Sequence, residues 1–397
     1  MCEVNILVTG LCLSGNKGGP AIALSMMKLL KKHLESSFCL SVPKSSFEQE
    51  MSWAMKYGVP IVPSLGRFDI LPPWSLKRER LFFLSAFRRA LFEADVVINC
   101  SGIAFVPGAT VGALLDDHAF HRLCVKARKP IFGWTQSYGP FEGLLSKYLA
   151  KKELSALPFL AARGERSQRN LQSLNLRRVI HNFPDSAFAL DRGDSRFAKA
   201  YLNKMGLDTE TPMVGICPNV GIIPLSGYSE LIKAIVEEFT KRDFEVVFVP
   251  HSIKSIASES DLALSKCVMA ALSERAQQRT HIVPDDLDYM ELKSIIGEMA
   301  FVVGSRYHAL VSAVSMGVPC VAVGWHEKYK DLLGLFGIAE ESWAYGEEPN
   351  EVLLARISSS LDRRDSTRLK IEENLARVTE EVEKSGRIFA EEIGAAI

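Results

Sequence analysis

One segment in the second half of the chain combines two basic side chains with the start of a helix. Arg306 and His308 follow the apolar run Phe301–Gly304, and small apolar residues continue from there to Gly317. A cation in the first turn of a helix opposes the helix dipole, so it requires an anionic partner. Either a structural ion pair or a bound phosphate or carboxylate supplies that partner, and we expect the bound anion.

A glycine-rich loop near the start of the chain is a second candidate for anion binding. It contains Asn16, Gly18 and Gly19, and Pro20 follows as a suitable first helical residue. Glycines let backbone amides approach a ligand closely, and the helix dipole adds partial positive charge there. The pattern is neither GxGxxG nor a P-loop. We expect a ligand-facing loop, with a tight strand-to-helix turn as the alternative.

Further polar side chains stand where apolar runs end. Arg163 closes the run Phe159–Ala162, Ser137 follows another apolar run, and His251 follows a third. A ligand contact is expected for Arg163, and a packing ion pair is the alternative. For His251, a ligand contact and a satisfied half-buried histidine are equally compatible with the sequence.

Two other groups invite a catalytic interpretation that the pattern does not favour. Asp116, Asp117, His118 and His121 have spacing that could place metal ligands on a helix, but no further ligand cluster is adjacent. An ordinary amphipathic helix is the better interpretation. Ser101 lacks the GxSxG context of a nucleophile elbow, and no catalytic triad is recognisable.

Short apolar runs alternate with helical patterns along the chain, which predicts α/β architecture with parallel sheets wrapped by helices. We expect an N-terminal α/β domain over residues 1–195 and a C-terminal one over 212–366, joined by a linker at 191–211. Residues 367–397 predict one or two helices, which could pack back on the first domain. Ligands bind beyond the carboxyl ends of parallel strands, so two facing domains would form one cleft.

Composition excludes several classes of function. The 397 residues include 47 Lys and Arg and 47 Asp and Glu, so the net charge is zero and neither nucleic acid nor a membrane surface is an expected partner. Eight cysteines form no CxxC pair, which favours reduced thiols. We find no secretion signal and no apolar stretch near the length of a transmembrane helix. The sequence predicts a cytoplasmic protein.

Several of these segments together resemble the polysaccharide pyruvyl transferase family, whose fold is similar to that of GT-B glycosyltransferases. The resemblance is carried in order by these segments: Gly15–Ala21, Gln136–Phe141, Arg163–Ser167, Phe183–Asp185, Val249–His251, Ser305–Ala309, Gly317–Pro319, and Trp325 with Lys328. It covers the chain from about Ile6 to Lys328. The Arg-x-His segment with its Gly-x-Pro ending is the most specific part.

The resemblance implies transfer of pyruvate from phosphoenolpyruvate to two hydroxyls of a sugar or lipid-linked glycan, forming a cyclic ketal and releasing phosphate. It implies that Arg163, Arg306, His308 and Lys328 surround the donor, with His308 and Arg163 as catalytic residues. His251, Asn16, Gly18, Gly19 and Ser137 would contribute to substrate binding. The resemblance also implies that the N-terminal domain is the acceptor side and the C-terminal domain the donor side. Neither a metal nor an organic cofactor is required, and a homo-oligomer is compatible with the sequence.

Two departures from the family pattern bear on this expectation. The family usually carries an acidic residue where Gly19 stands and a tyrosine where Trp325 stands. Two other functions therefore stay open: a GT-B glycosyltransferase or sugar-nucleotide epimerase that uses a nucleotide-sugar, and a non-catalytic sugar- or phosphate-binding homologue. The sequence leaves the acceptor sugar unspecified.

Overall fold

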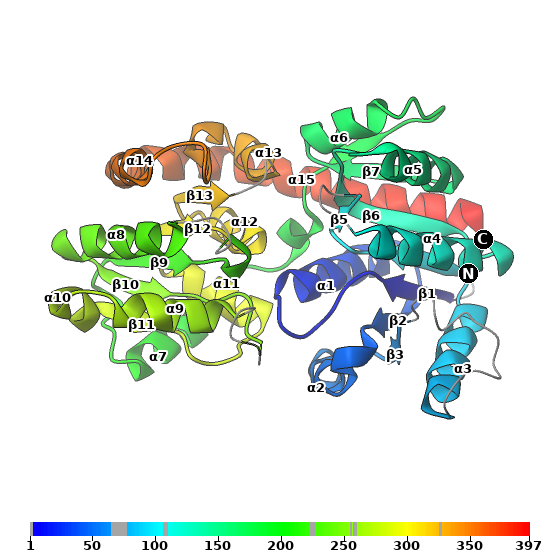
Figure 1. Ribbon diagram of the computed structural model, residues 1–397, viewed down its shortest axis with the longest axis horizontal. Coiled ribbons are helices and arrows are strands. Elements are labelled where there is room, and N and C mark those ends of the chain that lie inside the picture. Colours follow the sequence, from blue (N-terminus) through cyan, green and yellow to red (C-terminus); the bar gives the residue numbers. More distant parts are fainter. Residues whose placement is uncertain are drawn as a thin grey trace. The chain divides into compact units, whose positions relative to one another are not determined.

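The computed structural model describes residues 3–64, 78–105, 110–222, 227–254, 256, 260–324 and 328–397. The chain divides into two compact units (Figure 1). Unit 1 comprises residues 1–14, 22–190 and 380–397, and unit 2 comprises residues 15–21 and 191–379. The glycine-rich loop therefore belongs to unit 2, although residues on both sides of it belong to unit 1.

Unit 1 is built on a parallel sheet. Its strands are β1 (Val4–Thr9), β2 (Ser36–Val42), β3 (Ile61–Pro63), β4 (Val96–Asn99), β5 (Ile103–Ala104), β6 (Ile131–Tyr138), β7 (Leu160–Arg163) and β8 (His181–Phe183). The order in space is β3-β2-β1-β4-β6-β7-β8, with the short β5 paired to β6. The strand order reverses direction between β1 and β4, so the loops that follow these two strands diverge there.

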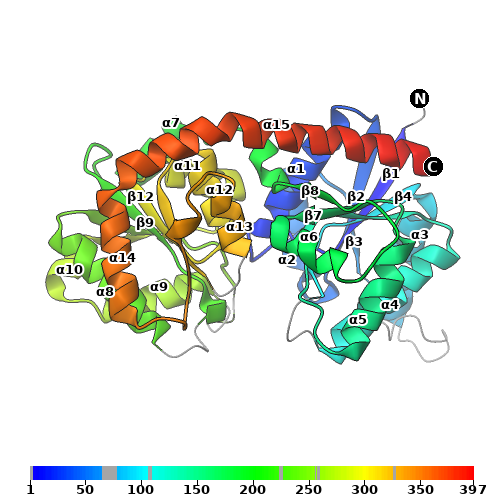
Figure 2. The same ribbon diagram turned by 90° about the horizontal axis from the view of Figure 1, so that it is seen from above.

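Helices cover both faces of this sheet. They are α1 (Gly18–Lys31), α2 (Phe47–Tyr57), α3 (Arg78–Glu93), α4 (Val111–Lys126), α5 (Leu144–Ala156), α6 (Glu165–Gln172) and the end of α15 (Arg364–Ala396). Figure 2 shows α1 and the end of α15 on one face, where Leu29 packs against Gly386 and the tilted rings of Phe389 and Trp134 lie 4.3 Å apart. Helices α3, α4 and α5 supply buried side chains to a core cluster on the sheet.

Unit 2 repeats the same plan with the strand order of a dinucleotide-binding fold. Its strands are β9 (Met213–Cys217), β10 (Glu245–Phe248), β11 (Thr280–Ile282), β12 (Phe301–Gly304), β13 (Cys320–Gly324) and β14 (Ser342–Ala344). They are parallel, in the order β11-β10-β9-β12-β13-β14. The point of reversal lies between β9 and β12. Near-continuous apolar strands are expected for a sheet that is covered on both faces.

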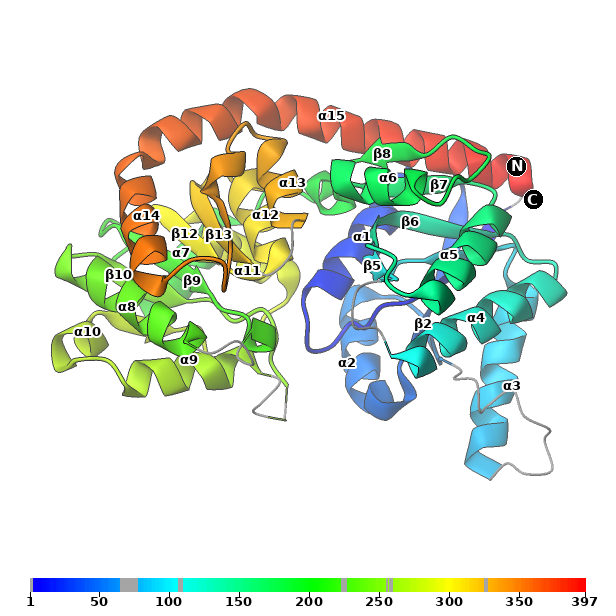
Figure 3. The same cartoon turned by 45° about the horizontal axis from the view of Figure 1, so that its top comes forward.

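The helices of unit 2 also lie on two faces (Figure 2). They are α7 (Ser195–Lys204), α8 (Tyr228–Lys241), α9 (Asp261–Ala270), α10 (Glu274–Gln278), α11 (Tyr289–Gly297), α12 (Tyr307–Ser315), α13 (Lys328–Gly334) and α14 (Asn350–Asp362). Helix α8 contacts α9, α10 and α14, whereas α11 contacts α7 and α12. The first part of α15 belongs to this unit and its end to unit 1 (Figure 3).

The segment 191–211, predicted as a linker, differs from that prediction because it contains helix α7. Asp194 caps this helix by accepting hydrogen bonds from the backbone amides of Arg196 and Phe197. Gly193 packs so closely that an added Cβ would lie 2.5 Å from Ser294 Cα. The segment is thus a packed part of unit 2. None of the described helices is long and apolar enough to span a membrane.

Candidate functional site

The strongest candidate site in unit 2 lies where its strand order reverses. Asn219 follows β9, and the turn Ser305–Arg306 follows the neighbouring β12. The Asn219 side chain donates a hydrogen bond to the Ser305 carbonyl (3.1 Å), and the buried Tyr329 hydroxyl donates another (2.9 Å). Both contacts hold the turn from which α12 starts. Crevices at such reversal points are the usual binding sites of open parallel sheets.

Arg306 occupies the N-cap position of α12 and pairs with a buried carboxylate. Its Nε and Nη2 atoms donate to the two oxygens of Asp261, at 2.8 and 2.6 Å. The Asp261 side chain is fully buried, and it also accepts from the backbone amides of Val220 (3.0 Å) and His251 (3.3 Å). The sequence offered Arg306 either a structural ion pair or a bound anion, and the structure contains the ion pair with Asp261. These bonds use one edge of the guanidinium, so Nη1 and the second hydrogen of Nη2 point away from Asp261.

His308 lies in the first turn of α12 and packs against the glycine-rich loop. A Cβ added to Gly18 would come within 2.5 Å of His308 Nδ1, so only glycine leaves room for the imidazole. The rings of Tyr289 and Tyr307 meet the His308 ring edge-on. The prediction that Gly18 and His308 serve one site gains physical support from this contact.

The glycine-rich loop is held to unit 2 by its backbone and by Lys17. Asn16 forms an antiparallel bridge with Ser252, and the Lys17 amide donates to the His251 carbonyl (2.9 Å). The Asn16 side chain accepts from the Gly18 amide (3.1 Å). Lys17 is fully buried, and its Nζ lies 2.5 Å from Asp286. The loop thus adds a buried cation to the site.

His251 is buried beside three basic side chains. Its Nδ1 lies 2.9 Å from the Val249 carbonyl, which can only accept, so Nδ1 carries the hydrogen. Burial is the main cause that lowers the pKa of His251 to about 3, and the nearby charges of Arg306, His308 and Lys17 contribute to the same shift. The ring is therefore neutral near pH 7. Its Nε2 has no hydrogen-bond partner among the described residues and remains an acceptor.

Lys328 begins α13, and its Nζ lies 5.8 Å from the ring centre of Tyr307 and 5.4 Å from that of Tyr329. Both tyrosines also border the Arg306 turn. Trp325, which carried part of the family resemblance, lies outside the described residues. Gly19 is the second residue of α1, and its amide donates to the Asn16 carbonyl at 3.4 Å.

In unit 1, Arg163 forms a buried ion pair with Asp185. Its Nη2 also donates to the Gly102 carbonyl (2.7 Å), and Nε lies 3.4 Å from the Ser137 hydroxyl. The Arg163 side chain is only 4% exposed. This setting favours the packing ion pair over the predicted ligand contact and catalytic role, because the guanidinium joins the ends of β6 and β7 to the segment after β8. Ser137 takes part in the same internal contact.

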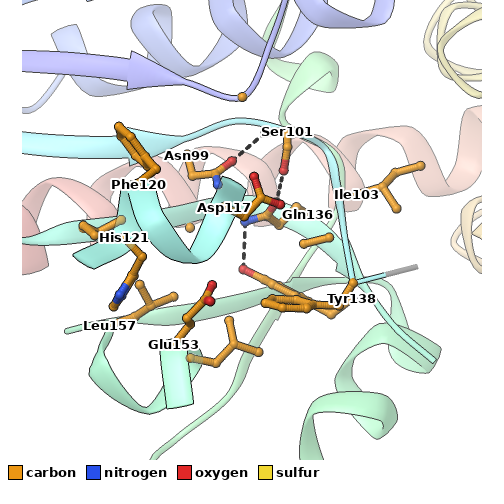
Figure 4. Close-up of a pocket in the computed structure, with 16 residues that line it drawn as sticks. Asn99, Ser101, Ile103, Asp117, Phe120, His121, Gln136, Tyr138, Glu153 and Leu157 are labelled. Carbon is orange, nitrogen blue, oxygen red and sulfur yellow. Dashed lines mark hydrogen bonds between the residues drawn. The ribbon is translucent and has the colours of Figure 1, made fainter. Parts of the chain in front are cut away.

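A separate pocket of about 130 Å³ lies in unit 1 between the sheet and helices α4 and α5 (Figure 4). It is lined by Gly10, Asn99, Ser101, Ile103, Ala104, Phe105, Asp117, Phe120, His121, Ile131, Gly133, Gln136, Tyr138, Glu153, Leu154 and Leu157. Burial raises the pKa of Asp117 to about 6 and that of Glu153 to about 8. The described residues contain no cluster of three or more His, Cys, Asp or Glu arranged to hold a metal ion.

Sequence reasoning missed two contributors to the unit 2 site. Lys17 stood inside the predicted loop but received no role, although a lysine between glycines was a visible signal. Asp261 carried no signal, because it lies 45 residues before Arg306 and begins an ordinary amphipathic helix. Only the fold brings the two together.

Comparisons with known proteins agree on family and fold. The family model described as polysaccharide pyruvyl transferase matches residues 16–327. The amylovoran biosynthesis protein AmsJ of Erwinia amylovora is 21% identical over 312 residues, which cover 75% of this chain and 72% of AmsJ.

Two solved structures show the same fold at low sequence identity. The UDP-GlcNAc 2-epimerase of Neisseria meningitidis, bound to UDP-GlcNAc, superposes with a TM-score of 0.59 at 11% identity and covers 99% of this chain and 100% of its own. A glycosyltransferase of Rickettsia africae gives 0.59 at 10% identity and 99% coverage of both chains. The predicted fold class, two Rossmann-like α/β units of the GT-B type, is confirmed.

Proposed function

Because the chain belongs to the polysaccharide pyruvyl transferase family, we propose that it transfers the pyruvyl group of phosphoenolpyruvate to two hydroxyls of a sugar. The product is a cyclic ketal on a polysaccharide or its precursor, and phosphate is released. The family and the likeness to AmsJ support a transferase role in polysaccharide biosynthesis. The donor and the ketal chemistry are the part that we propose from the site.

The observation that carries this proposal is the gathering of basic side chains at the start of α12. The Lys17 amide bonds to the His251 carbonyl, and Gly18, the next residue, packs against His308. Arg306 and the His251 amide share one oxygen of Asp261. The first amides of α12 add partial positive charge at the same place. Phosphoenolpyruvate presents a phosphate and a carboxylate on a three-carbon skeleton, so a compact group of cations and amides suits it.

His308 is the residue that we assign to proton transfer. An imidazole is the side chain best suited to give and take protons near neutral pH. In the first step it protonates the methylene carbon of the donor while a sugar hydroxyl oxygen bonds to the adjacent carbon. The proton of that hydroxyl returns to the imidazole. The carbon–oxygen bond to phosphate then breaks, the second hydroxyl closes the ketal, and phosphate takes its proton.

We do not assign the donation of the proton to His251, because a pKa lowered to about 3 leaves its ring neutral near pH 7. Its buried Nε2 can only accept a hydrogen bond. A hydroxyl of the sugar or a protonated phosphate oxygen would provide the donor. We therefore assign His251 to substrate binding, and Asp261 to positioning Arg306.

Thermal protection and phosphate release together test the proposal. Phosphoenolpyruvate at one hundred times its dissociation constant should stabilise the protein by about 2.7 kcal/mol, and UDP-GlcNAc should give no comparable protection. Lysates of polysaccharide-producing cells, extracted for glycan precursors, provide acceptors for a coupled phosphate assay. Protection by the nucleotide-sugar alone would refute the proposal in favour of a glycosyltransferase or epimerase. Donor binding without phosphate release from any acceptor would favour a non-catalytic binding protein.

A further inference from the structure

The pocket of unit 1 contains fixed polar groups that the proposed donor chemistry does not use. It opens at the carboxyl ends of β1 and β4, where the strand order of this sheet reverses. Ser101 Oγ donates to Gln136 Oε1 (2.7 Å), and Gln136 Nε2 donates to the Tyr138 hydroxyl (2.9 Å). Figure 4 shows this chain of hydrogen bonds together with Asp117 from α4 and Glu153 from α5, which also line the pocket.

The charge of the lining excludes an anionic ligand. Neither lysine nor arginine lines the pocket, whereas Asp117 and Glu153 both do. Helix α4 supplies Asp117, and α5 supplies Glu153, whose carboxylate also lies 2.9 Å from His118. A phosphate, a carboxylate or a nucleoside diphosphate would find no lysine or arginine in the lining to neutralise its charge, and the Asp117 carboxylate would repel it. A ligand for this pocket is therefore neutral or cationic.

The shape and polarity of the lining favour a neutral ring that carries hydroxyl groups. Amide, hydroxyl and carboxyl oxygens provide acceptors for hydroxyl hydrogens. Phe105, Phe120 and Tyr138 provide aromatic surface for the apolar C–H face of a sugar ring. A cavity of about 150 Å³ is sufficient for benzene, so 130 Å³ accommodates part of one six-membered ring and leaves the rest outside.

We propose that this pocket binds one sugar residue of the acceptor, through Asp117 and the Ser101–Gln136–Tyr138 chain of hydrogen bonds. The ring enters over the ends of β1 and β4, and the remaining glycan extends into solvent. The assignment of this sugar as the acceptor rests on the proposed function. The affinity of the pocket for a neutral sugar ring is independent of the proposed function, because it follows from the lining residues alone.

Ligand-observed NMR on the full chain tests the pocket directly, with methyl glycosides of glucose, galactose, mannose and N-acetylglucosamine as probes. Asp117→Asn removes a charged acceptor, and we expect at least a tenfold loss of affinity for the best probe. Ile103→Trp fills the pocket and should abolish binding. Asp116→Asn is the matched control, since it removes the same charge from the same helix outside the lining.

Unfolding curves identify any variant that fails to fold. If one of the two lining variants, Asp117→Asn or Ile103→Trp, does not fold, the other still tests the proposal. The proposal is overturned if no probe binds the wild-type protein, or if both lining variants bind the probe as the wild type does. Phosphoenolpyruvate protection is measured on the same samples. Donor binding without sugar binding would reject the pocket alone, and sugar binding without donor binding would reject the proposed donor alone.

Discussion

Replacing Asp261 with asparagine tests how the unit 2 site is organised, because four donors converge on this carboxylate. Arg306 Nη2 and the Val220 amide share Oδ1, while Arg306 Nε and the His251 amide share Oδ2. Asparagine turns one oxygen into an NH₂ group, so two of the four donors lose their acceptor. One of those two belongs to the guanidinium.

The size of the effect follows from burial. Asp261 is fully buried and the Arg306 side chain is 16% exposed, so solvent screens the pair weakly. Breaking a buried ion pair from one side costs about 3–5 kcal/mol, and we expect Asp261→Asn to lower the free energy of unfolding by about that amount. Urea unfolding followed by circular dichroism measures it. A loss below about 1 kcal/mol would show that the pair is not held as described.

A double-mutant cycle then separates positioning from direct contact. Arg306→Ala should weaken phosphoenolpyruvate binding by roughly 10–150-fold, since a hydrogen bond to a charged group contributes about 1.5–3 kcal/mol. Asp261→Asn should weaken it by about tenfold in the wild type and leave it unchanged in the Arg306→Ala background. Calorimetric titration of the donor gives all four affinities. Equal losses in both backgrounds would refute the positioning role.

Three further predictions concern the two sites. His308→Ala should lower the single-turnover rate at saturating donor by about 10²–10⁴-fold with a smaller change in affinity, and a rate loss under tenfold with impaired binding would make His308 a binding residue only. Gly18→Ala should displace the imidazole, because the new Cβ would lie 2.5 Å from Nδ1, so turnover falls while the melting temperature, read by circular dichroism, changes little. Burial raises the pKa of Glu153 from 4.5 to about 8, so the folded state binds the Glu153 proton more tightly than the unfolded state does. The stability that comes from this protonated carboxyl is therefore lost as pH rises from about 4.5 through 8. The melting temperature of Glu153→Gln should therefore fall less than that of the wild type between pH 5 and 9, and parallel curves would contradict the burial argument.

Much of the fold follows from local pattern in the sequence. The two apolar runs named in the sequence analysis lie in buried strands: Phe301–Gly304 forms β12, and most of Phe159–Ala162 lies in β7. Strands β3 and β14, toward the sheet edges, have only three residues each and were not predicted. Three residues carry too little periodicity to distinguish a strand from a loop.

The segment 191–211, predicted as a linker, begins where the chain passes from unit 1 to unit 2, but it also contains helix α7. Gly193 and the polar residues around it are typical of a flexible connection. In the structure this glycine is required by a close contact with Ser294, and Asp194 starts a helix. Composition alone does not distinguish a glycine that provides flexibility from one that provides space.

The candidate site shows the same limit. The sequence placed Arg306 and His308 at the start of α12, because a strand followed by a small-residue helix is a local pattern. It left the partner of Arg306 undecided, and the structure supplies Asp261 from another helix. For Arg163, a similarly buried carboxylate, Asp185, occupies the guanidinium. A local pattern predicts where a charge stands, whereas the tertiary contacts decide what neutralises it.

The two arginine pairs nevertheless differ in what they leave for a ligand. The Arg163 side chain is 4% exposed. Its guanidinium bonds to Asp185, to the Gly102 carbonyl and to the Ser137 hydroxyl, all of which belong to unit 1. Arg306 is more exposed and meets Asp261 through one edge of the guanidinium. An arginine fixed along one edge has already lost its rotamer freedom, so a ligand that meets the other edge does not bear that entropy cost. The ion pair at Arg306 therefore leaves one edge of the guanidinium for the anionic donor that we propose, whereas Arg163 joins the ends of β6 and β7 to Asp185 after β8.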